Sequence, residues 1–500
     1  SSEKLIWTQI LLLFPAMTDK TIYRKIFFSA AAYTGLKGFF ALATTVCTIL
    51  LIRALSPYEF GKFSLVSHLA MMSGLILSFG SSGTLAKFMP EYKEERSKAR
   101  LASQALEISA LGTLIFFALL ALVLRLYPQF IPSEIKKVGP AFPLFILSIA
   151  LFNVVQGIFR GTGRFLAWSA LEGSAEIAAR LLAIAFIFLL AKTFYSAFWA
   201  FSLSFAVFVL ISLVQIRPLL DWHDLAIPKT VLRYGTLLFL GQIVFMLITS
   251  VDPILLRLLL KDPAQVGFYF AGIKIPRMLE SLMLAPMSVP FVYYFSHPDT
   301  LHTRETIITF GTKMLGISCG LTALTLFAAA QDIVTLALGP GYAESVIVLR
   351  IYSALLFFVG LQSLSGSFFL AINKPQISIA LGFCGFAIIA LLDFLLIPTW
   401  KAAGAASATV IGSFIVTLAI TAQLWRHGIK IARESLLLCL GLMLSMAVGY
   451  LTSFYYLAPI SFALYVVLVG LLKEHDLAKI QKLWNKQNDY EQPAQDSPIL

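Results

Sequence analysis

Charged side chains are scarce in this chain. Asp, Glu, Lys and Arg make up 13% of its 500 residues, whereas soluble domains contain about 25%. Hydrophobic residues account for 59%, and the mean hydropathy is +0.85. This balance excludes an ordinary soluble domain and indicates an integral membrane protein.

Cysteines and catalytic motifs are also few. None of the four cysteines forms a CxxC pair, so neither a disulfide framework nor a metal site is indicated. The sequence contains no GxSxG turn, no phosphate-binding loop before Lys-Ser/Thr and no metal-ligand spacing. We therefore expect a protein that is not an enzyme and that carries no metal or other cofactor.

The chain instead consists of apolar stretches, each long enough to cross ~30 Å of hydrocarbon as a helix. We predict an all-α polytopic membrane protein with about fourteen transmembrane helices, since a helix satisfies its own backbone in lipid. The expected spans are residues 26–52, 63–88, 102–127, 139–160, 166–191, 194–216, 231–256, 265–294, 306–330, 345–371, 376–398, 403–424, 433–452 and 455–472.

Most of the basic residues outside these spans lie in every second connection between spans, which places them on one side of the membrane. The positive-inside rule places the richer set in the cytoplasm, so we expect both termini there and the protein in the cell inner membrane. The net charge of +12 then reflects topology and not nucleic-acid binding. The smaller, outer set is Arg53, Lys62, Arg125, Lys136, Lys137, Lys192, Arg257, Lys261 and Lys401.

Two pairs of segments repeat at nearly the same offset. Pro57–Gly61 and Pro263–Gly267 both read P-x-x-x-G after a span, and residues 159–171 match 369–381 around short turns. The repeat implies two six-helix bundles of equal orientation plus two C-terminal helices, with a substrate site between the bundles. The expected division is an N-terminal cytoplasmic or interfacial segment 1–23, a first lobe 24–217, an inter-lobe loop 218–229, a second lobe 230–426, two added helices 427–472 and a cytoplasmic polar tail 473–500.

Residues 55–63 (LSPYEFGKF) and 80–90 (GSSGTLAKFMP) resemble the first loop and following run of polysaccharide flippases. These belong to the multidrug/oligosaccharidyl-lipid/polysaccharide exporter superfamily. Asp252, Pro263 and Gly267 repeat the pattern in the second half. The resemblance implies two lobes around a V-shaped central cavity. It also implies alternating-access transfer of a polyprenyl-diphosphate-linked oligosaccharide to the outer leaflet, as in O-antigen flippases.

Basic residues within the spans are the first candidate site. Ionisable groups at membrane depth usually face a cavity or a partner. Lys37 lies near the middle of the first span, and Lys274 and Arg277 lie near the start of the eighth. The resemblance implies that basic residues in these spans line the cavity, so we expect the three to bind the substrate diphosphate. The alternative is ion pairing between residues of the helices, for instance Arg277 with Glu280.

Acidic residues form a second candidate set. Glu172, Glu176 and Arg180 recur at steps of four on one face of the fifth span, and Glu176–Arg180 has the spacing of a helix ion pair. We expect either a structural network or a polar path for sugar or protons. Asp252, near the outer end of the seventh span, fits a gate or structural pair with nearby Arg257, or an ion-coupling site.

Other functions stay open on the sequence alone. A cation-coupled multidrug antiporter shares the fold but needs an acidic cavity, and a lipid II type flippase is a further alternative. A membrane polymerase or ligase usually needs a large outer loop, which the short segment 127–140 does not provide. The expected partners are a lipid-linked oligosaccharide and membrane lipids. A coupling ion (H⁺ or Na⁺) and polysaccharide polymerase machinery are further candidates.

Overall fold

The computed structural model confirms the all-α class. It is helical throughout and contains no strand among the residues it describes. Segments 1–19 and 472–500 and most of the expected inter-lobe loop lie outside the described residues. The predictions made for these segments therefore stay predictions. The described residues are 20–92, 94–126, 133–221, 229–296, 304–372, 374–429 and 431–471.

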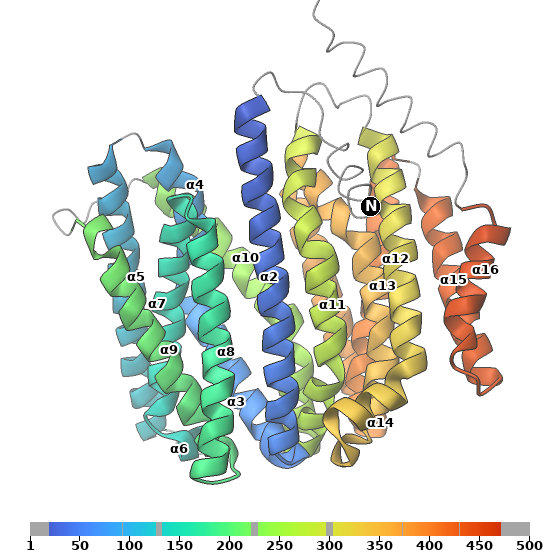
Figure 1. Ribbon diagram of the computed structural model, residues 1–500, viewed down its shortest axis with the longest axis horizontal. Coiled ribbons are helices and arrows are strands. Elements are labelled where there is room, and N and C mark those ends of the chain that lie inside the picture. Colours follow the sequence, from blue (N-terminus) through green and yellow to red (C-terminus); the bar gives the residue numbers. More distant parts are fainter. Residues whose placement is uncertain are drawn as a thin grey trace, which may run out of the picture.

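Figure 1 shows the helices standing side by side. The first half of the chain contains α2 (Lys20–Ala54), α3 (Pro57–Leu77), α4 (Ser81–Phe88), η1 (Met89–Glu91), α5 (Glu95–Leu126), α6 (Ser133–Val138), α7 (Ala141–Gly161), α8 (Phe165–Leu189), α9 (Phe194–Ile216) and η3 (Arg217–Leu219). The second half contains α10 (Lys229–Leu260), α11 (Pro263–Ser296), α12 (Arg304–Ile333), η5 (Val334–Leu338), η6 (Pro340–Tyr342), α13 (Ser345–Ala371), α14 (Pro375–Arg426), α15 (Ala432–Leu451) and α16 (Leu457–Leu468).

Every expected span overlaps a described helix. The long helix α14 contains two of the spans, and the backbone of Lys401 turns between them with φ 52° and ψ −130°. Nine stretches of the described residues are long and apolar enough to cross a membrane. The membrane-spanning class is therefore clear, and the count of fourteen crossings stays a prediction.

The second sequence repeat corresponds to two similar turns. The amide of Arg164, after α7, donates to the carbonyl oxygen of Phe159 at 2.8 Å. The amide of Lys374, after α13, donates to the carbonyl oxygen of Phe369 at 2.8 Å. A backbone hydrogen bond between residues five apart in the sequence caps the carbonyl end of a helix and reverses the chain. The matched segments therefore end their helices in the same way.

The helices form two groups that meet along a seam. We call α2–α9 the first group and α10–α14 the second group, and α15 and α16 pack against α12 at the edge of the second (Figure 1). Leu51 of the first group and Val266 and Tyr342 of the second half share one continuous hydrophobic core. The predicted lobe boundaries, the inter-lobe loop and the V-shaped cavity stay predictions.

The first sequence repeat lies at this seam. A Cβ atom on Gly61 of α3 would lie 1.8 Å from the carbonyl oxygen of Pro263, and one on Gly267 of α11 would lie 2.1 Å from that of Pro57. Such distances exclude any side chain, so only glycine permits these helices to cross here. The two P-x-x-x-G segments therefore contact each other reciprocally.

Two further hydrogen bonds join the groups at the same end. The hydroxyl of Tyr342 donates to the carbonyl oxygen of Leu55 at 3.1 Å. Nη2 of Arg53 donates to the carbonyl oxygen of Leu336 at 2.8 Å. These bonds satisfy backbone oxygens at the end of α2 and at the π-turn of η5, so this end of the seam is closed.

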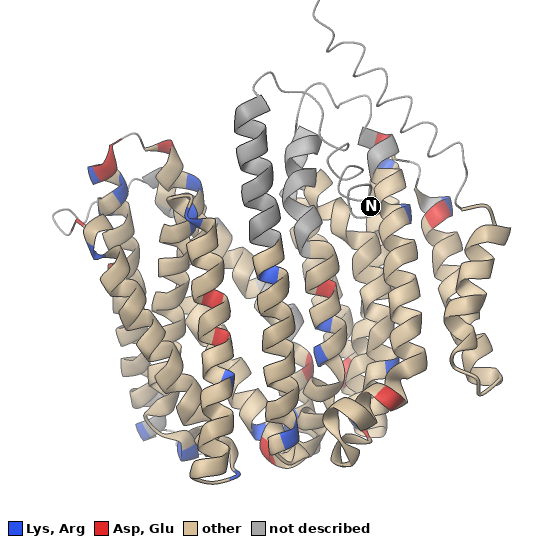
Figure 2. Cartoon of the chain, in the orientation of Figure 1, with Lys and Arg blue, Asp and Glu red and all other residues tan. Residues whose placement is uncertain are grey.

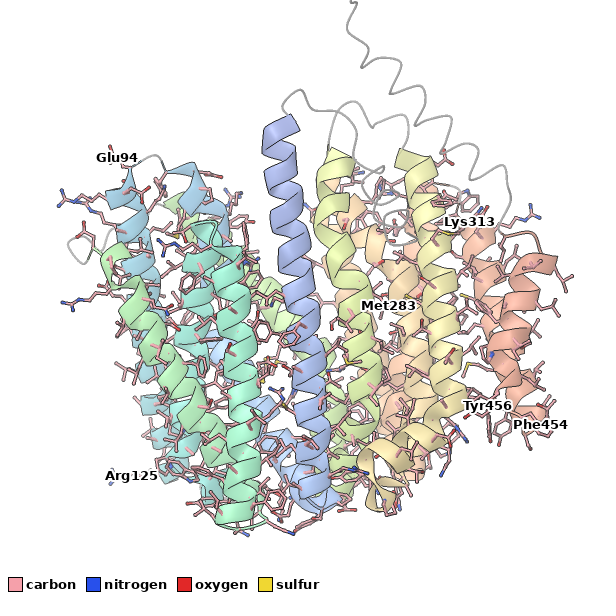
Figure 3. The ribbon with its side chains drawn as sticks, viewed as in Figure 1. Glu94, Arg125, Met283, Lys313, Phe454 and Tyr456 are labelled. Atoms are coloured by element: carbon pink, nitrogen blue, oxygen red, sulfur yellow. The ribbon has the colours of Figure 1, made fainter. Side chains whose placement is uncertain are left out.

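The charged residues mark the two ends of the molecule. Figure 2 shows them gathered at the upper and lower ends, with a smaller group at mid-depth on α2, α8 and α11. Figure 3 places Glu94 toward the upper end and Arg125 toward the lower end, and Met283 at an intermediate height in the second group. The predicted topology assigns the upper end to the cytoplasm and the closed, lower end to the outer face.

Candidate functional site

Lys37 of α2 pairs with Glu172 of α8 inside the first group. Their ammonium and carboxylate groups form an ion pair, and about a third of each side chain remains exposed (33% and 29%). The Lys37 ammonium also lies 4.5 Å from the centroid of the Trp168 ring. An ion pair and an aromatic face together hold this cation within the first group.

A small residue next to Glu172 brings the two helices together. A Cβ atom on Gly173 would lie 2.0 Å from Cγ of Phe40, so the ring of α2 lies directly on the α8 backbone. Phe40 is about one helical turn from Lys37, and Gly173 adjoins Glu172. The close packing of α2 on α8 thus positions the ion pair.

The rest of the α8 stripe forms the predicted helix pair. Nη1 of Arg180 lies 3.2 Å from Oε2 of Glu176, which confirms the i, i+4 spacing. Nε of Arg180 also donates to the hydroxyl of Thr48 on α2 at 2.8 Å. The stripe is therefore a network that ties α8 to α2, and every charged member of it has a partner.

Arg160 is a residue that the sequence analysis did not single out. Its guanidinium lies 4.9 Å from the centroid of the Trp168 ring, which also contacts Lys37, and Nη1 donates to the hydroxyl of Ser82 at 3.3 Å. The residue lies in the last turn of α7. The sequence signal that could have found Arg160 is its closeness to Trp168 across a short turn. The Trp168 ring there contacts two cations, Lys37 and Arg160.

Lys274 and Arg277 of α11 differ from the first group's cations. Nε of Arg277 donates to the hydroxyl of Tyr352 on α13 at 3.1 Å. Within the part of the chain that the structure describes, neither residue has an ion pair, and Lys274 has no hydrogen bond. The alternative pairing of Arg277 with Glu280 is limited to a longer-range electrostatic interaction.

Lys274 faces the first group across the seam. It interacts electrostatically with Arg180 and Glu176 of α8 as well as with Arg277. The structure therefore brings Lys274 next to the predicted α8 stripe. It does not join Lys274 to Lys37, whose contacts are with Glu172 and Trp168.

Asp252 of α10 lies in a buried acidic cluster with α11 and α14. Its carboxylate accepts hydrogen bonds from the hydroxyl of Tyr269 and, at 2.5 Å, from that of Thr409. Asp393 of α14 interacts with it electrostatically. Only 3% of Asp252 and none of Asp393 is exposed.

In the described structure this cluster forms no ion pair, and Arg277 of α11 acts on Asp252 only through a longer-range electrostatic interaction. Among the described residues, Oδ1 of Asp252 and both Oδ atoms of Asp393 are buried without a hydrogen-bond partner. Arg257, which the sequence suggested as a partner, pairs instead with Glu134, with Nη2 and Oε1 2.6 Å apart. Nothing in the sequence connects Asp393 with Asp252, because the contact arises from the packing of α10 on α14.

Comparison with known proteins identifies the family of this chain. A family model described as "Polysaccharide biosynthesis protein" matches residues 28–293. The chain belongs to this family. The match covers α2 to most of α11, and so includes all the site residues predicted from the sequence. A search of curated proteins finds no match.

Solved structures show which fold the family member adopts. A lipid II flippase, MurJ, in an inward closed conformation aligns with a TM-score of 0.70 and 15% identity, covering 90% of this chain and 100% of that one. An inward-facing multidrug resistance MATE transporter of the MOP superfamily aligns with a TM-score of 0.61 and 16% identity, over 79% and 96% of the two chains.

A third structure shares the fold and differs in its pocket. It is a MOP superfamily transporter from Pyrococcus furiosus, described as having a binding pocket of reverse polarity that suggests a different function. It aligns with a TM-score of 0.55 and 15% identity, over 80% and 97% of the two chains. At such identities the likeness establishes the fold, that of MOP superfamily transporters.

Proposed function

We propose that this chain moves a polyprenyl-diphosphate-linked oligosaccharide from the inner to the outer leaflet of the cell inner membrane by alternating access. Membership of the family supports a role in polysaccharide biosynthesis, and the fold supports a flippase or transporter. The observation that carries the substrate proposal is the lack of an ion pair at both Lys274 and Arg277 in the described structure. A diphosphate supplies the missing negative charge.

The chemistry of the two side chains suits that group. The guanidinium of Arg277 uses Nε for Tyr352, which leaves its terminal nitrogens for phosphate oxygens. Lys274 adds a compact charge with three donors. Lys274 interacts with α8 and with Arg277, so a diphosphate bound by the two is held at the seam while the polyprenyl tail stays in lipid. Movement of one group against the other then carries the head group across.

The Asp252 and Asp393 carboxylates are proposed as the coupling-ion site. Two buried carboxylates need a proton or a cation to compensate them. The hydroxyls of Tyr269 and Thr409 fix the Asp252 carboxylate, and the open Oδ atoms can accept H⁺ or coordinate Na⁺. Because the acids join α10 to α14, loss of the ion alters packing within the second group.

A multidrug antiporter is less well supported by the charges. A cationic drug needs an unpaired acid at the seam, and Glu172 and Glu176 both pair with cations of the first group. A lipid II type flippase is the second candidate, because the MurJ structure covers 90% of this chain. The Pyrococcus structure indicates that pocket polarity varies within the fold, so the substrate must be tested directly.

Deletion of the gene in a host without a second copy tests the proposal. We expect loss of one surface glycan and accumulation of its lipid-linked precursor, measured by mass spectrometry of lipid extracts. Complementation with the full chain should restore both. An unchanged glycan would contradict the proposal. Arrest of peptidoglycan synthesis would point to lipid II, and retention of cationic dyes would point to an antiporter.

A further inference from the structure

A pocket with several cationic lining residues lies apart from Lys274 and Arg277. It has a volume of about 250 Å³ and is lined by residues of α3, of α6, of the end of α10, of the α10–α11 connection and of the first residue of α11. It therefore spans the seam between the two groups, at the end where α3 and α11 begin. Its charged lining residues are Lys62, Lys137, Arg257, Lys261, Glu134 and Asp262.

Both acidic residues of this pocket have partners within the protein. Glu134, only 3% exposed, pairs with Arg257 at 2.6 Å. Oδ1 of Asp262 accepts the amide hydrogen of Ala264 at 2.9 Å, in the first turn of α11. The lining therefore contains four cationic side chains and two carboxylates, one of which pairs with Arg257.

The lysines of the pocket differ in their partners. Lys62 lies 3.3 Å from Glu59 and 3.8 Å from the centroid of the Tyr58 ring. Lys137 of the first group and Lys261 of the second line the same pocket without an ion pair or hydrogen bond in the described structure. Both lysines are exposed, and they line one cavity from opposite sides of the seam.

The predicted topology makes this gathering unusual. Basic residues are sparse on the outer face of membrane proteins, yet Lys62, Lys137, Arg257 and Lys261 come from distant parts of the sequence to one outer pocket. The left-handed backbone of Lys261, with a φ of 56°, ends α10 and fixes where this lysine leaves the helix.

We propose that this pocket binds a phosphate or diphosphate group on the outer face. Its volume is below that of sites for drug-sized ligands, ~300–1,000 Å³, so it suits a phosphoryl group and not an oligosaccharide. An anion between Lys137 and Lys261 bridges the two groups. It therefore stabilises the closed outer end that the Gly61–Gly267 crossing forms. The group comes either from an anionic phospholipid head group or from a soluble phosphate.

Anion binding to the purified full chain in nanodiscs tests this pocket. In phosphatidylcholine nanodiscs, inorganic pyrophosphate should raise the thermal midpoint in a saturable way. In a second arm, phosphatidylglycerol replaces part of the phosphatidylcholine and no pyrophosphate is added. Stabilisation in the first arm identifies a soluble phosphate as ligand, and stabilisation in the second arm alone identifies a lipid head group.

Matched variants locate the effect. Lys137→Gln/Lys261→Gln should bind the anion about tenfold more weakly, the size expected for two partly exposed ion pairs, and Lys137→Arg/Lys261→Arg should retain binding. Lys136→Gln is the control, because this neighbour lies on α6 but does not line the pocket. No saturable stabilisation in either arm, wild-type affinity in the double Gln variant, or an equal loss in Lys136→Gln would overturn the proposal. None of these measurements depends on transport. The anion-pocket proposal can therefore be contradicted while the proposed function stands, and the reverse also holds.

Discussion

The two helix groups differ in how the charged residues of their candidate sites are paired. In the first group, Lys37 pairs with Glu172 and Arg180 with Glu176. In the second group, Lys274 forms no ion pair or hydrogen bond in the described structure, and the buried acids Asp252 and Asp393 form no ion pair there. Unpaired charges at membrane depth are costly and mark sites of function. We therefore propose a structural role for the paired charges of the first group and a binding role for Lys274, Asp252 and Asp393 of the second.

The acidic cluster should give the largest effect. Asp252→Asn/Asp393→Asn removes both carboxylates while keeping side-chain volume. We expect ion-driven flipping in proteoliposomes to fall about a hundredfold. A charged side chain at this depth of the membrane costs ~2.5–3.5 kcal/mol, and a loss of that size in the transport barrier corresponds to about two orders of magnitude in rate. The thermal midpoint should not fall, because no ion pair is broken.

Asp332→Asn is the matched control for the acidic cluster. Asp332 is an exposed acid near the end of α12 that accepts a hydrogen bond from Tyr456. Flipping that keeps its full dependence on the ion gradient in the double variant would remove these carboxylates from the coupling step.

Lys274 should give the next largest effect. Lys274→Met keeps the length of the side chain and removes its charge. We expect the flipping rate to fall about tenfold, the size of one charge-assisted hydrogen bond to phosphate, while the thermal midpoint stays constant or rises. Lys274→Arg should keep most activity. A stability loss without a loss of flipping would show that Lys274 is structural, like the charges of the first group.

The sequence predicted contacts that are local or repeated better than contacts made by packing. The Glu176–Arg180 pair follows from helical spacing. The P-x-x-x-G repeat was visible in the sequence, although the contact between its two copies on α3 and α11 was not predicted. Glu172, in contrast, is 135 residues from Lys37, and no periodicity specifies which helix lies next to α2. For the same reason Asp393 received no role from the sequence.

The first group's ion pair should give the smallest effect, and on stability alone. Lys37→Met and Glu172→Gln should each lower the thermal midpoint by roughly 2–4 °C, since a partly exposed pair contributes about 1 kcal/mol. The double variant should recover part of that loss, because neither charge is then left without its partner. Flipping should change less than threefold in all three, well below the change for Lys274→Met. A loss of flipping in Lys37→Met without a change in midpoint would place Lys37 in the substrate path, as the flippase resemblance implies, and the contrast between the two groups would then lie in the acids alone.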